Sequence, residues 1–126
     1  MSFRHQYVIG DLQGCYAAFQ QLLKTLDFDP KQDKLWFAGD LVARGEDSLN
    51  TLRHVKVLCE QGAAATVLGN HDINLIAVWR GAAKLKEKDK TAPIFAAKDC
   101  DELLEWLRHQ PVLAYPDEYT VLVHAG

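Results

Sequence analysis

Four polar side chains that can bind metal ions follow short apolar stretches of the sequence. They are Asp11, Asp40, Asn70 and His124. The apolar runs that precede them are 7–9, 35–38, 66–68 and 120–123. Carboxylate and amide oxygens together with imidazole nitrogens suit manganese, magnesium, iron or zinc, and no thiolate is needed. Successive spacings of 29 and 30 residues among the first three are close to one βαβ unit, so we expect the four groups to converge at one sheet edge.

The segments between the first three groups have the pattern of crossover helices. Apolar positions recur with the helical period in residues 16–26. A second helix is predicted to begin with Ser48 as its cap and to end before Gly62. A third helix is expected from residue 72 or 73 to residue 80. The predicted fold class is therefore α/β with a largely parallel sheet, in which ligands bind at the carboxyl ends of the strands.

The remainder of the chain has weaker patterns. Residues 82–97 are crowded with charges and have no clear period, which favours a mobile, solvated surface loop; the alternative is a cationic rim near a polyphosphate site. A short helix is predicted over 101–110, before Pro111. Two strands, 112–115 and 120–123, are expected to form a hairpin with its turn at 116–118.

Composition narrows the class of protein. The 126 residues, 48% of them hydrophobic, are enough for one globular domain with a core. A net charge of -3 argues against nucleic acid as the main partner, because phosphate binding requires a basic excess. No apolar run approaches the ~20 residues that span a bilayer, so no membrane partner is expected. Three cysteines without a CxxC pair favour a reducing cytoplasm over a disulfide framework.

The ordered motifs resemble those of the calcineurin-like metallophosphoesterases. The four stretches that carry the resemblance are Gly10-Asp-Leu-Gln-Gly14, Gly39-Asp-Leu-Val-Ala-Arg-Gly45, Gly69-Asn-His-Asp72 and His124-Ala-Gly126. Within this superfamily, residues 35–72 and Trp106-Leu-Arg-His-Gln-Pro111 are most similar to the bacterial symmetrical diadenosine tetraphosphatase subfamily. The resemblance covers essentially the whole chain. It implies the amino-terminal part of a four-layer α/β/β/α sandwich, spanning residues 1–126 and truncated after the His-Ala-Gly motif.

The resemblance also implies a dinuclear centre. By the family pattern Asp11 binds the first divalent ion, Asp40 bridges both ions, and Asn70 and His124 bind the second. Gln13 stands where the superfamily usually has a histidine ligand, so its amide is expected to be a weak ligand of the first ion. Manganese is the expected metal, with cobalt, magnesium, iron or zinc as alternatives.

Three further residues receive catalytic roles from the resemblance. His71 is expected to protonate the leaving phosphate oxygen, and Arg44 to bind a nonbridging oxygen of the substrate. Asp72 is a candidate for orienting His71, with a backbone carbonyl as the alternative. Ala43 and Asp72 replace two acids of the serine/threonine phosphatases, which lowers the expectation of protein phosphatase activity.

The implied activity is that of a phosphoric anhydride hydrolase. A metal-bound water would cleave diadenosine tetraphosphate, a small-molecule dinucleoside polyphosphate, symmetrically to two ADP. A phosphoprotein serine/threonine phosphatase and a noncatalytic metal- or nucleotide-binding fragment are the alternatives. Because the partner sheet would be missing, we expect exposed apolar surface, self-association and weak activity of this chain.

Overall fold

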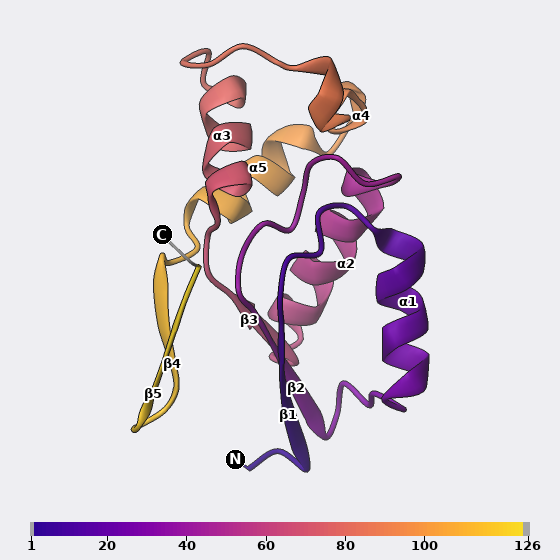
Figure 1. Ribbon diagram of the computed structural model, residues 1–126, viewed down its shortest axis with the longest axis vertical. Helices are drawn as coiled ribbons and strands as arrows, with labels where there is room; N and C mark the ends of the chain where they lie inside the picture. Colours follow the sequence, from indigo (N-terminus) through magenta and orange to yellow (C-terminus); the bar gives the residue numbers. More distant parts are fainter. Residues whose placement is uncertain (1, 125–126) are drawn as a thin grey trace.

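The first half of the chain forms a three-stranded parallel sheet with two crossover helices (Figure 1). The computed structural model describes residues 2–124. Its first elements in chain order are β1 (His5–Ile9), α1 (Tyr16–Thr25), β2 (Asp33–Phe37), α2 (Ser48–Glu60) and β3 (Ala64–Thr66). The strand order is β1-β2-β3, and both pairs are parallel. The predicted α/β class and parallel sheet are confirmed.

Alternation along β2 explains how the sheet is covered. Leu35 and Phe37 are fully buried on one face, where the ring of Phe37 meets that of Phe19 from α1 edge to face at 5.7 Å. Leu52 and Val55 of α2 complete the same core. Both helices lie on one face because the strands are added in one direction by right-handed crossovers. Each of these side chains contributes about 1.5–3 kcal/mol by its burial.

A helical layer lies beyond the carboxyl ends of the strands (Figure 1). Its elements are α3 (Asn70–Trp79), the 3-10 turn η1 (Glu87–Asp89), α4 (Ala92–Ala96) and α5 (Cys100–Arg108). The prediction of a solvated loop over 82–97 is wrong for its second half, because Asp89 and Ile94 are buried. Elements of three and five residues are too short to produce a recognisable period, and the buried Ile94 secures the segment to the core.

The last described strands form a separate antiparallel hairpin, β4 (Leu113–Asp117) and β5 (Thr120–Val123). The turn is formed by residues 118–119 rather than 116–118, and the Oδ1 atom of Asp117 accepts the N–H of Tyr119. Pro116 lies inside β4, where the pairing with β5 is irregular, as expected for a residue without an N–H. Within residues 2–124, β5 pairs only with β4, so the expected hairpin is confirmed.

Candidate metal centre and active site

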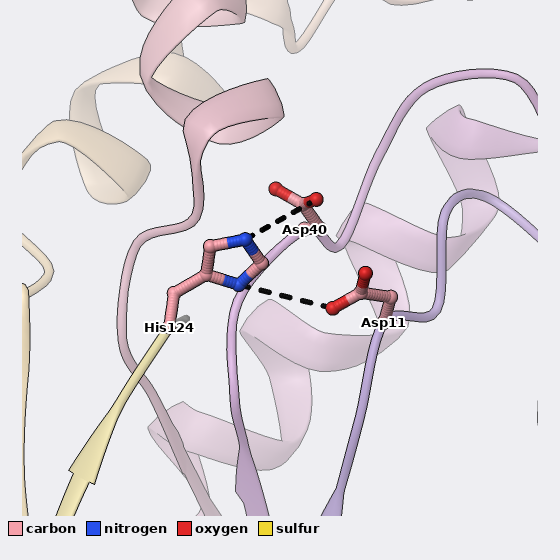
Figure 2. A group of neighbouring side chains, drawn as sticks. All are labelled: Asp11, Asp40 and His124. Atoms are coloured by element: carbon pink, nitrogen blue, oxygen red, sulfur yellow. Dashed lines mark ion pairs between the residues drawn. The ribbon is translucent and has the colours of Figure 1, made fainter. Parts of the chain in front are cut away.

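Asp11, Asp40 and His124 converge beyond the carboxyl ends of β1 and β2 (Figure 2). One donor atom from each lies within 4.8 Å of the others. The Nε2 atom of His124 is 3.5 Å from Oδ2 of Asp40, and its Nδ1 atom is 3.8 Å from Oδ1 of Asp11. Three residues that are far apart in the sequence therefore supply two carboxylates and an imidazole to one small volume.

The contacts of His124 fit a metal ligand. Its Nδ1 lies 2.9 Å from the carbonyl oxygen of Ala38, to which it can donate a hydrogen bond. This leaves Nε2 with a lone pair, facing Oδ1 of Asn70 at 3.0 Å and Oδ2 of Asp40. Three acceptor atoms then point at one another without a hydrogen between them, an arrangement that a divalent cation satisfies. The donor set is of the mixed oxygen and nitrogen type that manganese, magnesium, iron and zinc accept.

Asp40 connects this centre to His71. Its carboxylate is almost fully buried; Oδ1 accepts the backbone N–H of His71 at 2.9 Å, and Oδ2 lies 3.0 Å from the Nδ1 of that ring. With Nδ1 donating to Asp40, Nε2 is the ring atom available to exchange a proton with a ligand. The side chain of His71 remains 16% exposed, so a ligand can reach it.

Asp72 contacts the backbone rather than His71. It is fully buried, and its carboxylate accepts the N–H groups of Leu41 at 2.9 Å and Gly69 at 3.0 Å. Burial raises the pKa of Asp72 to about 6, although both backbone hydrogen bonds oppose the rise. These contacts of Asp72 therefore do not correspond to the candidate role of orienting His71. Asp72 instead ties the loop after β2 to the first turn of α3, which begins at Asn70 rather than at residue 72 or 73.

Two glycines allow these loops to approach each other. Gly39 has φ +97, and a Cβ atom there would lie 2.6 Å from the backbone nitrogen of Gly69. A Cβ at Gly69 would collide with the Oδ1 and backbone nitrogen of Asp40. The glycines before Asp40 and Asn70 in the two motifs thus permit the backbone contact that brings these ligands together.

Gln13 and Arg44 occupy the adjoining loops. The backbone of Gln13 donates to the carbonyl of Asp40 at 2.9 Å and accepts the N–H of Gly45 at 2.7 Å. Arg44 has φ +76, and its N–H donates to the carbonyl of Asp89 at 2.7 Å. The Nε atom of Arg44 lies 3.8 Å from Oδ1 of Asp89.

Sequence reasoning missed Asp89 as a partner of Arg44. It also made Ser48 the cap of α2, whereas Asp47 accepts the N–H of Asn50 in that position. The hydroxyl of Ser48 instead accepts the N–H of Ala43, in the loop that carries Arg44. A local pattern cannot decide which of the adjacent Asp47 and Ser48 caps the helix. Asp89 could not be distinguished from the other charged residues near it in the sequence.

Comparisons with known proteins identify the family of the chain. Residues 6–126 match the calcineurin-like phosphoesterase family. Symmetrical bis(5'-nucleosyl)-tetraphosphatases from Aliivibrio fischeri and Vibrio parahaemolyticus are 56% and 58% identical to the chain, over 95% of its length in each case. The chain spans 44% of the length of each of these two relatives.

Solved structures support the same fold. A protein described as a diadenosine tetraphosphatase is 31% identical and superposes with a TM-score of 0.74, over 94% of this chain and 49% of its own. A metallophosphoesterase from Sphaerobacter thermophilus, at 20% identity, shares the fold with a TM-score of 0.66, over 90% of this chain and 43% of its own. Motifs, geometry and relatives therefore agree that the chain belongs to the calcineurin-like phosphoesterase family.

Proposed function

We propose that the chain carries metal-binding and catalytic groups of a hydrolase that cleaves diadenosine tetraphosphate symmetrically to two ADP. The observation that carries the proposal is the convergence of Asp11, Asp40, Asn70 and His124, which suits two divalent ions sharing Asp40. The substrate is proposed from relatives that are more than half identical and are named symmetrical bis(5'-nucleosyl)-tetraphosphatases.

In this proposal the ligands divide between the two ions. Asn70, His124 and Asp40 would hold one ion, and Asp11 and Asp40 the other, with the amide of Gln13 as a weak additional ligand. Manganese is our proposed metal. Divalent ions in such a centre supply an activated water and neutralise charge on the phosphoryl oxygens.

The remaining groups act on the substrate or position those that do. His71, held at Nδ1 by Asp40, would donate a proton from Nε2 to the oxygen of the leaving ADP. Arg44, whose side chain is half exposed beside the same site, would bind a nonbridging phosphate oxygen. Asp72 is a positioning residue in this proposal, because its carboxylate joins the loops of Asp40 and Asn70.

Product analysis tests the reaction. The manganese-loaded protein should convert diadenosine tetraphosphate to ADP alone, as resolved by ion-exchange chromatography. ATP plus AMP, or phosphate released only from phosphoproteins, would contradict the proposal. Metal binding without any turnover would favour a binding fragment, because the chain spans less than half of its tetraphosphatase relatives.

Two substitutions test the assigned roles. Asp40→Asn should abolish binding of both ions in calorimetry, whereas His71→Ala should keep the ions and lower kcat by roughly 10²–10⁴-fold. His109→Ala is the matched control, because His109 is exposed and contacts Glu105 rather than the site. Loss of metal in His71→Ala with retention in Asp40→Asn would reverse the assignment.

We also propose a reducing cytoplasm as the location and self-association of the chain. The three cysteines are free thiols. Among the described residues, no helix has the length and apolar character needed to cross a membrane.

Val8 on β1 is 61% exposed, and exposed apolar side chains recur on the β4–β5 hairpin, at Val121 and Val123. Sedimentation velocity should detect dimers that weaken in Val8→Lys, and a monomer at every concentration would contradict self-association.

A further inference from the structure

A polar pocket of about 270 Å³ adjoins the candidate metal centre. The residues that line it are Arg44, Asn70, His71, Asn74, Lys86, Lys88 and Asp89. Three of them, Arg44, Asn70 and His71, belong to the motifs described above. The other four come from α3 and from residues 82–97, the basic segment that was expected to be a solvated loop. The pocket therefore joins the proposed catalytic residues to groups that have no assigned role.

The chemistry of the lining identifies the kind of ligand. All seven side chains are polar or charged, and sites that enclose a drug-sized molecule are lined mainly by apolar groups and occupy about 300–1,000 Å³. The lining is thus too polar to enclose the base of a nucleoside. Three cations face a single carboxylate, that of Asp89, which is nearly buried beside Arg44. A group with several anionic oxygens, such as phosphate, fits this lining.

Lys86 and Lys88 are available for such a ligand. Among residues 2–124 neither lysine has a carboxylate within ion-pair distance, although Glu87 lies between them and Asp89 follows Lys88 in the sequence. Their place beside Arg44 is determined by the backbone: the carbonyl of Asp89 accepts the N–H of Arg44, and the N–H of Asp89 donates to the carbonyl of Lys86. Burial of Ile94 then secures the segment to the core.

We propose that Lys86 and Lys88 bind phosphate oxygens of the leaving nucleotide and make the site selective for polyphosphates over simple monoesters. The inference rests on the proposed function, in which His71 gives its proton to the leaving oxygen. Hydrolysis forms a bond from water oxygen to phosphorus and breaks the bond between phosphorus and the oxygen that bridges the two middle phosphates. Since His71 lines the same pocket, the phosphates of the departing ADP extend from that oxygen toward the two lysines.

A matched pair of double variants tests this inference. Lys86→Gln/Lys88→Gln removes two charges from the pocket, and Lys84→Gln/Lys90→Gln removes two charges from the same exposed segment without altering the pocket lining. With manganese, the pocket variant should raise KM for diadenosine tetraphosphate by roughly tenfold or more. Its kcat/KM for p-nitrophenyl phosphate, whose leaving group carries no phosphate, should change less than about twofold. The control should behave as the parent protein.

Binding of inorganic tripolyphosphate provides a second measurement that does not depend on turnover. Calorimetry without manganese should show roughly tenfold weaker binding to the pocket variant than to the control. Equal binding by both variants would overturn the lysine assignment, as would an unchanged KM for diadenosine tetraphosphate. If the parent protein releases no ADP, and only the pocket variant shows weakened tripolyphosphate binding, the proposed reaction is refuted but the proposed anion site is supported.

Discussion

Replacing Gly69 by alanine inserts one methyl group between the loops that carry Asp40 and Asn70. The backbone of Gly69 has φ -98 and ψ 175, an extended conformation that alanine adopts without strain. The cost is therefore steric. The new Cβ would overlap the Oδ1 and backbone nitrogen of Asp40 and lie 2.9 Å from its Cγ. Since carbon contacts are optimal at about 3.5–4.0 Å, the loops must separate by about 1 Å.

This separation has two measurable consequences. Overpacking of this kind costs about 1–3 kcal/mol, and the reduced entropy of the unfolded chain offsets about 0.4–1 kcal/mol. We therefore expect Gly69→Ala to lower the free energy of unfolding by about 1–2 kcal/mol in urea titrations with EDTA. Displaced ligands should also weaken manganese binding, measured by calorimetry, by roughly 10- to 100-fold.

Gly10→Ala is the control for this experiment. Gly10 precedes Asp11, just as Gly69 precedes Asn70, but a Cβ atom at Gly10 would meet nothing within 4 Å, and its φ is outside the left-handed region. Gly10→Ala should be neutral or more stable by up to about 1 kcal/mol, with unchanged metal affinity. If Gly69→Ala unfolded at the same urea concentration as Gly10→Ala and bound manganese equally well, the close approach of the loops would not be what assembles the site.

Three other substitutions test the electrostatics and packing of the fold. Hydrogen bonds from Arg4, and then from the N–H of Asp29, hold the pKa of the Asp33 carboxyl below 3.8. The free energy of unfolding of the parent protein, measured by urea titration, should therefore exceed that of Asp33→Asn, and this difference should disappear as the pH falls below that value. Burial raises the pKa of Asp72 to about 6, so the stabilisation that its protonated form provides at pH 4 is lost as the pH rises through 6. In EDTA, the free energy of unfolding of the parent should therefore fall by about 3 kcal/mol relative to that of Asp72→Asn by pH 7. Parallel pH profiles of unfolding free energy for the two proteins would refute this. Ile94→Ala should cost about 2–5 kcal/mol in thermal or urea unfolding and weaken tripolyphosphate binding, whereas a change under 1 kcal/mol would mean that α4 is not anchored by this side chain.

The sequence alone was sufficient for the elements that depend on local periodicity. Short apolar runs and helical periodicity predicted the βαβ units, and the polar residues at the strand ends predicted the ligand types. Those predictions succeed because neighbouring residues determine strand and helix formation, and because parallel strands must present their carboxyl ends at one edge. The resemblance to a family added the proposed roles of Asp11, Asp40 and His71 from short motifs in a fixed order.

Only the tertiary structure decided which partners the polar residues have. Asp72 follows His71 directly in the chain, yet its carboxylate bonds to the backbone of two loops, while Asp40, 31 positions away, holds the ring of His71. Likewise Asp89 joins the basic segment to Arg44. Such contacts depend on how closely the loops pack, because a buried carboxylate must find donors wherever the backbone presents them. Local sequence patterns contain no information about that distance, and the metal centre and the lysine-lined pocket both depend on it.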